Sequence, residues 1–133
     1  MSGPPDLARS AAQWASKAEH DFRNAEYTAT LQEDCPFDTV CFHAQQCAEK
    51  YLKVLLLQAG GEPPRTHDLR LLLQRLAPDL AVLFRMEDMV ELNRYSIEAR
   101  YPGEWEEISR AEAERAVTKA RAVGTAARLA LAR

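Results

Sequence analysis

The sequence predicts an all-α protein: an up-down antiparallel four-helix bundle with one additional short helix. Apolar residues recur at three- and four-residue spacing through most of the 133 residues. No stretch of four or more residues alternates between apolar and polar side chains, as a half-buried strand would. Capping residues, glycine and proline divide the chain into five helical segments with short connections, which favours antiparallel neighbours.

Length and composition are those of one globular domain. A chain of 133 residues, 47% hydrophobic and 28% charged, can bury a single core and does not have the composition of a disordered chain. Residues 1–6 contain Pro4 and Pro5, which disfavour helix. We therefore expect a flexible N-terminal leader at 1–6 and a single helical domain at 7–133.

The first helix is expected to run from Leu7 or Ser10 to Leu31. Its buried stripe consists of small and aromatic residues at helical spacing: Ala11, Trp14, Ala15, Ala18, Phe22, Ala25 and Ala29. Asp21 lies off this stripe, and His20 is expected to face solvent.

The second helix can be capped by Asp38, and Gly60 and Gly61 end it. Its broad apolar face is formed by Cys41, Ala44, Ala48, Tyr51, Leu52 and Leu55. The polar residues roughly opposite are Gln46, Glu49, Lys50 and Lys53. His43 falls on the border between the two faces. Lys50 and Lys53 are typical of the solvated face of a helix, and Glu49 and Lys53 can form an ordinary i,i+4 ion pair.

Two further helices are expected before residue 100. Thr66 is a natural N-cap for a short helix with an apolar face of leucines: Leu69, Leu72, Leu73 and Leu76. Asp79 is expected to cap a fourth helix from Leu80 to Glu98. Asn93 falls on the apolar side of that helix and needs a hydrogen-bond partner if it is buried.

The last helix is expected to begin at a capping box formed by Ser109 and Glu112 and to continue to Leu131. Its buried residues are nearly all small: Ala113, Ala116, Val117, Ala120, Val123, Ala127 and Leu131. Small side chains let helix axes come close together, so this helix should approach a neighbour closely.

Several classes of function are disfavoured. No apolar run approaches the roughly 20 residues of a membrane-spanning helix, and no secretion signal precedes the domain, so we expect a cytoplasmic protein without membrane contact. A net charge of −3 gives no overall attraction to nucleic-acid phosphates. The spacing of Cys35, Cys41 and Cys47 favours buried thiols over a disulfide or a metal site, and we expect neither a metal nor a cofactor.

Three segments occur in a characteristic order: FHAQQCAEKYLK at 42–53, THDL at 66–69 and ARYP at 99–102. Together they resemble motifs of the minimal HEPN domain, the higher eukaryotes and prokaryotes nucleotide-binding domain. The likeness extends to residues 14–22 and so covers nearly the whole chain. The resemblance implies an antiparallel helical bundle that commonly forms a homodimer. It also implies a small nucleotidyltransferase partner, in toxin–antitoxin or defence-type modules of prokaryotes.

Many HEPN proteins are ribonucleases whose signature is an arginine followed, after four to six residues, by a histidine. The imidazole moves a proton at the ribose, and the guanidinium stabilises the phosphate charge. In this sequence the window after Arg100 holds Trp105, Glu106 and Glu107 instead of histidine. This departure disfavours RNA cleavage by the usual motif.

The candidate residues for binding a nucleotide or a partner are His43, Gln46, Lys50, Asn93, Arg100 and Tyr101. His43 and Lys50 are two turns apart on one side of the second helix and could bind a base or phosphate. His43 could also be a packed, hydrogen-bonded histidine of the bundle. His67 and Asp68 can fasten the start of the short helix. No catalytic residue is assigned; the candidates are Arg100, His43 and His67.

Three functional hypotheses follow. The first is a HEPN-like nucleotide- or partner-binding module, a homodimer that works with a nucleotidyltransferase in a toxin–antitoxin or defence-type system. The second is a metal-independent ribonuclease toxin that cleaves RNA at a displaced active site, with Arg100 acting beside His43 or His67. The third is a purely structural adaptor.

Overall fold

The computed structural model describes residues 4–96 and 107–132, and these form helices, turns and loops without a strand. Their helices are α1 (Pro4–Thr28), α2 (Phe37–Gln58), α3 (Leu69–Gln74), α4 (Pro78–Ala81), α5 (Met86–Asn93) and α6 (Arg110–Leu131). The predicted all-α class is confirmed.

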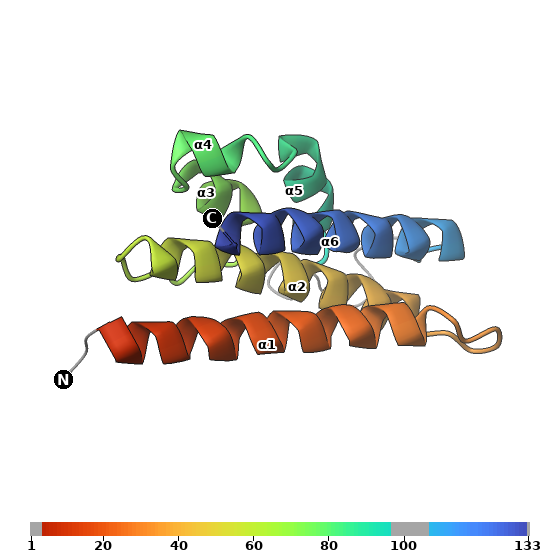
Figure 1. Cartoon of the computed structure of the whole chain (residues 1–133). Helices are drawn as coiled ribbons and strands as arrows, with labels where there is room; N and C mark the ends of the chain where they lie inside the picture. The colour runs from red at the N-terminus through yellow and green to blue at the C-terminus, as the bar shows by residue number, and fades with distance from the viewer. Residues whose placement is uncertain (1–3, 97–106, 133) are drawn as a thin grey trace.

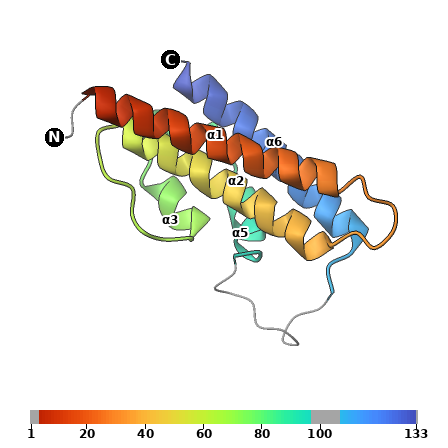
Figure 2. The ribbon, with the colours of Figure 1, turned by 90° about the horizontal axis from the view of Figure 1, so that it is seen from below.

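The three long helices form the body of the bundle. α2 packs against α1 and against α6, and α1 runs antiparallel to both (Figure 1). The short helices α3, α4 and α5 together take the place of the remaining helix, on the side of α2 and α6 away from α1. The view from below shows α2 between α1 and the short helices α3 and α5 (Figure 2). α2 is therefore the central helix of the bundle.

The prediction of one helix from Leu80 to Glu98 is wrong. α4 ends at Ala81, and α5 begins at Met86 after Arg85 adopts an extended conformation. The break has a packing reason. Phe84 and Met89 are both buried, but five residues on a continuous helix would place them about 140° apart. A break lets both side chains enter the core.

The helix starts also differ from the prediction at several positions. Asp68, not Thr66, caps α3: its carboxylate accepts a hydrogen bond from the backbone N–H of Arg70 at 3.0 Å. Thr66 accepts one from the N–H of Asp68 instead. Asp38 and Asp79 lie in the first turns of α2 and α4, where a carboxylate favours the positive helix end, but neither is the N-cap.

The predicted ends of the long helices agree with the structure at Ser109 and Gly60 and differ from it at the start of α1. Ser109 caps α6 by accepting from the N–H of Glu112 at 3.1 Å, as predicted. The left-handed Gly60, with φ of 98°, follows the end of α2, also as predicted. α1 begins at Pro4, earlier than expected. Proline suits a first helical turn because the N–H it lacks has no partner there.

The predicted apolar face of α2 is confirmed, because all six of its residues are buried. The small-residue face of α6 is buried as well, apart from the partly exposed Leu131. At Gly124, α6 lies close to Tyr51 of α2, because a Cβ atom there would lie 3.3 Å from Cε2 of Tyr51. The Tyr51 hydroxyl donates to Glu19 at 3.1 Å and accepts from Arg128 at 3.2 Å, so its ring is held from α1 and α6.

The cysteines lie inside or beside the bundle. Cys41 and Cys47 are buried, and Cys35 is half-buried with its thiol donating to the carbonyl of Thr28. Burial, together with the nearby Asp21 carboxylate, raises the pKa of Cys47 to about 12. Within the described ranges, no three His, Cys, Asp or Glu side chains are grouped to hold a metal ion. None of the described helices is long and apolar enough to cross a membrane.

Candidate functional site

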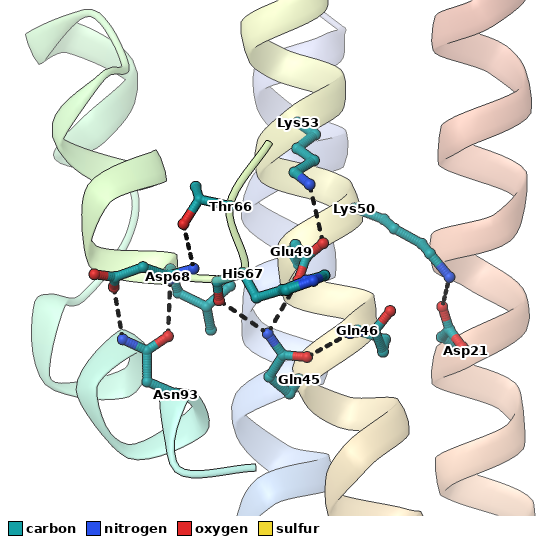
Figure 3. Close-up of polar contacts among 11 residues, drawn as sticks. Asp21, Gln45, Gln46, Glu49, Lys50, Lys53, Thr66, His67, Asp68 and Asn93 are labelled. Atoms are coloured by element: carbon teal, nitrogen blue, oxygen red, sulfur yellow. Dashed lines mark hydrogen bonds and ion pairs between the residues drawn. The ribbon is translucent and has the colours of Figure 1, made fainter. Parts of the chain in front are cut away.

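Three predicted binding residues share one edge of α2. His43, Gln46 and Lys50 are spaced i, i+3 and i+7, which places them on the same side of a helix. Asp21 of α1 faces this edge. Its carboxylate lies 2.8 Å from His43 Nδ1. The same carboxylate accepts a hydrogen bond from Lys50 Nζ (Figure 3). The structure therefore brings two of the predicted residues together on one carboxylate of a neighbouring helix.

This edge is half-buried. The side chains of His43 and Lys50 are 24% and 22% exposed, and that of Asp21 is 11% exposed. Asp21 was expected off the buried stripe of the first helix, but α2 covers it. A buried carboxylate is costly without partners, so His43 and Lys50 stabilise it. We call Asp21, His43, Gln46 and Lys50 the α1–α2 polar edge.

The chemistry of the polar edge follows from these contacts. When His43 donates through Nδ1 to Asp21, Nε2 at the opposite side of the ring is an acceptor. The ring of Phe42 packs edge-on against the imidazole, with centroids 5.5 Å apart, and restricts its orientation. The Lys50 ammonium has two N–H groups beyond the one directed at Asp21. The edge can thus offer both an acceptor and donors to a ligand.

A second polar cluster surrounds Glu49. Its carboxylate accepts from Lys53 at 3.0 Å and from Gln45 at 3.2 Å, and lies 2.9 Å from His67 Nδ1 (Figure 3). The prediction that Lys53 lies on a solvated face is wrong, because Lys53 is only 8% exposed, and its partner Glu49 is 4% exposed. The Lys53 ammonium also lies 5.7 Å from the centre of the Trp14 ring.

Gln45 connects the second cluster to the first and was not among the predicted site residues. It is fully buried, donates to the carbonyl oxygen of His67 at 3.3 Å and accepts from Gln46 at 2.7 Å. The position of Gln45 in the sequence does indicate that its side chain is buried. Gln45 is four residues after Cys41 and three before Ala48, so it lies on the apolar stripe of α2.

Asn93 lies away from the α1–α2 polar edge, at the start of α3. Its side-chain oxygen accepts from the N–H of Leu69 at 2.8 Å, and its amide donates to Asp68 at 2.8 Å. The predicted need for a hydrogen-bond partner is therefore met at the start of α3. Figure 3 shows Asn93 and Asp68 on the opposite side of α2 from Asp21. The structure does not bring Asn93 to the polar edge, and Arg100 and Tyr101 lie outside the described residues.

Two of the three motif segments converge in these clusters. FHAQQCAEKYLK supplies the α2 side chains of both, and THDL crosses beside α2 so that His67 reaches Glu49. The model of the HEPN domain family matches residues 11–129. The chain belongs to the HEPN family. The family resemblance seen in the sequence is therefore confirmed over most of the chain.

Two solved structures are similar to this HEPN protein along most of their length. The crystal structure of TT1696 from Thermus thermophilus has 30% sequence identity and a TM-score of 0.74, and the match covers 89% of this chain and 95% of that one. ST0689, an archaeal HEPN homologue, has 25% identity and a TM-score of 0.68, with 89% and 94% of the chains covered. No curated protein matches the chain.

The contact between Asn93 and Asp68 predicts a dependence of stability on pH. The hydrogen bond from Asn93, with a further one from the Arg70 N–H, holds the pKa of Asp68 below its ordinary value of 3.8. A lowered folded-state pKa stabilises the protein above the unfolded-state pKa, and this contribution is lost as the pH falls through the folded-state value. Wild type should therefore lose stability when the pH is lowered from 7 to 3.

Replacing Asn93 by alanine should change both the stability at pH 7 and the loss of stability on acidification. At pH 7 we expect a loss of about 1–3 kcal/mol, because the buried N–H of Leu69 loses its acceptor. Between pH 7 and 3 the further loss should be smaller than in wild type. Urea unfolding at both pH values measures these quantities, with the exposed Asn24→Ala as the control. An equal acid-induced loss in wild type and Asn93→Ala would show that Asn93 does not set the Asp68 pKa.

Proposed function

We propose that this HEPN protein is a nucleotide-binding helical module that forms a homodimer and works with a nucleotidyltransferase in a toxin–antitoxin or defence-type system. The observation that supports nucleotide binding is the gathering of His43 and Lys50 on Asp21 at a half-buried edge. The homodimer and the nucleotidyltransferase partner are supported by what the family resemblance implies.

The α1–α2 polar edge suits a ligand better than the Glu49 cluster does. In the Glu49 cluster the side chains of Lys53 and Glu49 are only 10% and 5% exposed. At the polar edge the corresponding exposure is more than twice as large for His43 and Lys50. A phosphate oxygen can share the ammonium of Lys50 with Asp21, while His43 Nε2 can accept a hydrogen bond from a nucleoside.

Charge balance at this edge limits the affinity. The negative charge of Asp21 offsets that of Lys50, so an incoming phosphate meets little net positive charge. We expect nucleotide binding to be modest in strength and to weaken as salt screens the Lys50–phosphate attraction. This separates the proposal from a preformed phosphate site, in which several unpaired cations face the ligand.

Titration calorimetry with ATP, AMP and GTP tests the site. Lys50→Ala should weaken the binding of a phosphate-bearing ligand about 10-fold to 100-fold, because a hydrogen bond to a charged group contributes about 1.5–3 kcal/mol. His43→Ala should weaken it as well. Lys17→Ala and His20→Ala are matched controls, since both residues are exposed on α1.

Thermal unfolding of each variant shows whether the fold survives the substitution. Equal nucleotide affinity in all four variants would place the ligand elsewhere. Absence of any heat of binding with wild type would remove nucleotide binding from the proposal. The partner is tested separately, by co-expression with the product of an adjacent nucleotidyltransferase gene.

One observation keeps ribonuclease activity as a second candidate. A carboxylate at Nδ1 orients His43 in the way that acid–base histidines are commonly oriented in enzymes. Arg100 would have to supply the stabilising charge at this displaced site. Incubation of RNA with wild type and Arg100→Ala decides the matter, because equal inactivity of the two proteins removes the candidate. A structural adaptor, by contrast, would keep its partner when Arg100 or His43 is replaced.

A further inference from the structure

The amide of Gln45 can take only one orientation. Its side chain is fully buried, so its polar atoms need partners inside the protein. The nitrogen donates to the carboxylate of Glu49 at 3.2 Å and to the carbonyl oxygen of His67 at 3.3 Å. Both partners accept hydrogen bonds and cannot donate them. The nitrogen of Gln45 must therefore lie on this side of the amide, and the oxygen faces the opposite way.

Gln46 takes its orientation from Gln45. The oxygen of Gln45 can only accept, and the nitrogen of Gln46 donates to it at 2.7 Å. A flipped Gln46 amide would set two oxygens against each other, so the hydrogen bond fixes which end is which. The oxygen of Gln46 is directed away from Gln45, as Figure 3 shows. Gln46 is half-buried, and among the residues that the structure describes none donates a hydrogen bond to this oxygen.

The α1–α2 polar edge thus presents an acceptor whose position is fixed. Gln46 is three residues after His43 and four before Lys50, so it lies between them on one side of α2. The N–H groups of Lys50 suit a phosphate oxygen, whereas the oxygen of Gln46 suits an N–H donor. Adenine, guanine and cytosine each carry such a donor in an exocyclic amino group. The two side chains therefore complement different parts of one nucleotide.

We propose that Gln46 selects the base of the bound nucleotide, its side-chain oxygen accepting a hydrogen bond from an exocyclic amino group, and that Gln45 is the positioning residue that holds this oxygen outward. An amide free to flip can accept from an amino group or donate to a keto group. The amide held by Gln45 is restricted to the first of these. This inference rests on the proposed nucleotide binding at the polar edge and assigns the base preference of that site.

Three pairs of ligands, each differing by one amino group, test the base preference. AMP differs in this way from purine riboside monophosphate, GMP from IMP, and CMP from zebularine monophosphate. In titration calorimetry with wild type, the amino group should strengthen binding about 3-fold to 10-fold in the pair whose base the site accepts. Equal affinities within all three pairs would overturn the inference and leave nucleotide binding standing. Absence of binding by every one of these ligands would remove both.

Two substitutions test the roles of Gln46 and Gln45 in turn. Gln46→Ala removes the oxygen, so the preference for the amino group should disappear. Gln45→Met keeps a core side chain of similar volume but releases the Gln46 amide, so the preference should disappear there too. The gain from the phosphate, measured as nucleotide against nucleoside, should stay as in wild type in both variants. Gln58→Ala, at an exposed glutamine at the end of α2, is the matched control and should keep the preference.

A preference retained in Gln46→Ala would overturn the assignment of Gln46. A preference retained in a folded Gln45→Met would show that Gln45 does not position it. Nitrogen relaxation of the side-chain amides in wild type tests the same point without a core substitution. The Gln46 amide should be rigid on the nanosecond timescale, unlike that of the exposed Gln58. Equal mobility of the two amides would overturn the role of Gln45, even if Gln45→Met does not fold.

Discussion

Replacing Glu49 by alanine should lower the free energy of unfolding by about 3–5 kcal/mol. The substitution removes the carboxylate that pairs with the Lys53 ammonium at 3.0 Å. Lys53 is 8% exposed and would remain as a buried charge that has lost its ion pair with Glu49. Gln45 and His67 would also lose their shared acceptor. Urea unfolding, followed by the helical circular dichroism signal, measures the loss.

Three further variants separate charge from hydrogen bonding. Glu49→Gln keeps an oxygen acceptor and should cost less than Glu49→Ala. The double variant Glu49→Leu/Lys53→Met removes both charges and should recover most of the stability, because an apolar pair of similar volume can replace a buried ion pair. Glu33→Ala, at an exposed position, should change the free energy by less than about 0.5 kcal/mol. A loss below about 1 kcal/mol for Glu49→Ala would contradict the burial of this pair.

Leu52→Ala should be the most disruptive single change on the apolar face of α2. Leu52 is fully buried in the central cluster of the bundle, and truncating such a leucine costs about 2–5 kcal/mol through lost contacts and the cavity that remains. The matched control is Leu31→Ala, at a leucine that is 44% exposed after α1.

Urea unfolding measures the change in the free energy of unfolding for Leu52→Ala and for Leu31→Ala. Leu31→Ala should change the free energy by about 0.5 kcal/mol or less, because its side chain is only partly removed from water. The denaturant slope of Leu52→Ala should match that of wild type if the loss lies in the folded core. Similar losses in the two variants would mean that α2 is not the central helix of the bundle.

The apolar face of α2 could be predicted from the sequence because its cause is local. A period of about 3.6 residues states which side chains share a side of a helix, and the buried face of α2 follows directly. The same reasoning misplaced Glu49 and Lys53. Their burial is caused by Trp14 of α1 and by His67 of the connection to α3, and the helical period carries no information about such neighbours.

The helix break after Ala81 was foreseeable in principle. The apolar residues up to Phe84 and those from Met89 onward lie on different sides of one continuous helix, which is a signal against a single helix from Leu80. Part of the candidate site was foreseeable too, since the spacing of His43 and Lys50 placed them on one edge. Asp21 was not, because only the packing of α1 on α2 brings it there.

Gly124 favours one longitudinal alignment of α6 on α2. The buried face of α6 is nearly repetitive, with Ala116, Ala120 and Ala127 at similar intervals, so on its own it distinguishes poorly between neighbouring registers. Sliding α6 by one turn, about 5.4 Å, would bring a Cβ atom to the place of Gly124, 3.3 Å from the ring of Tyr51, and the ring would have to move by a few tenths of an ångström. The missing methyl group at Gly124 therefore favours one register over others of similar apolar burial.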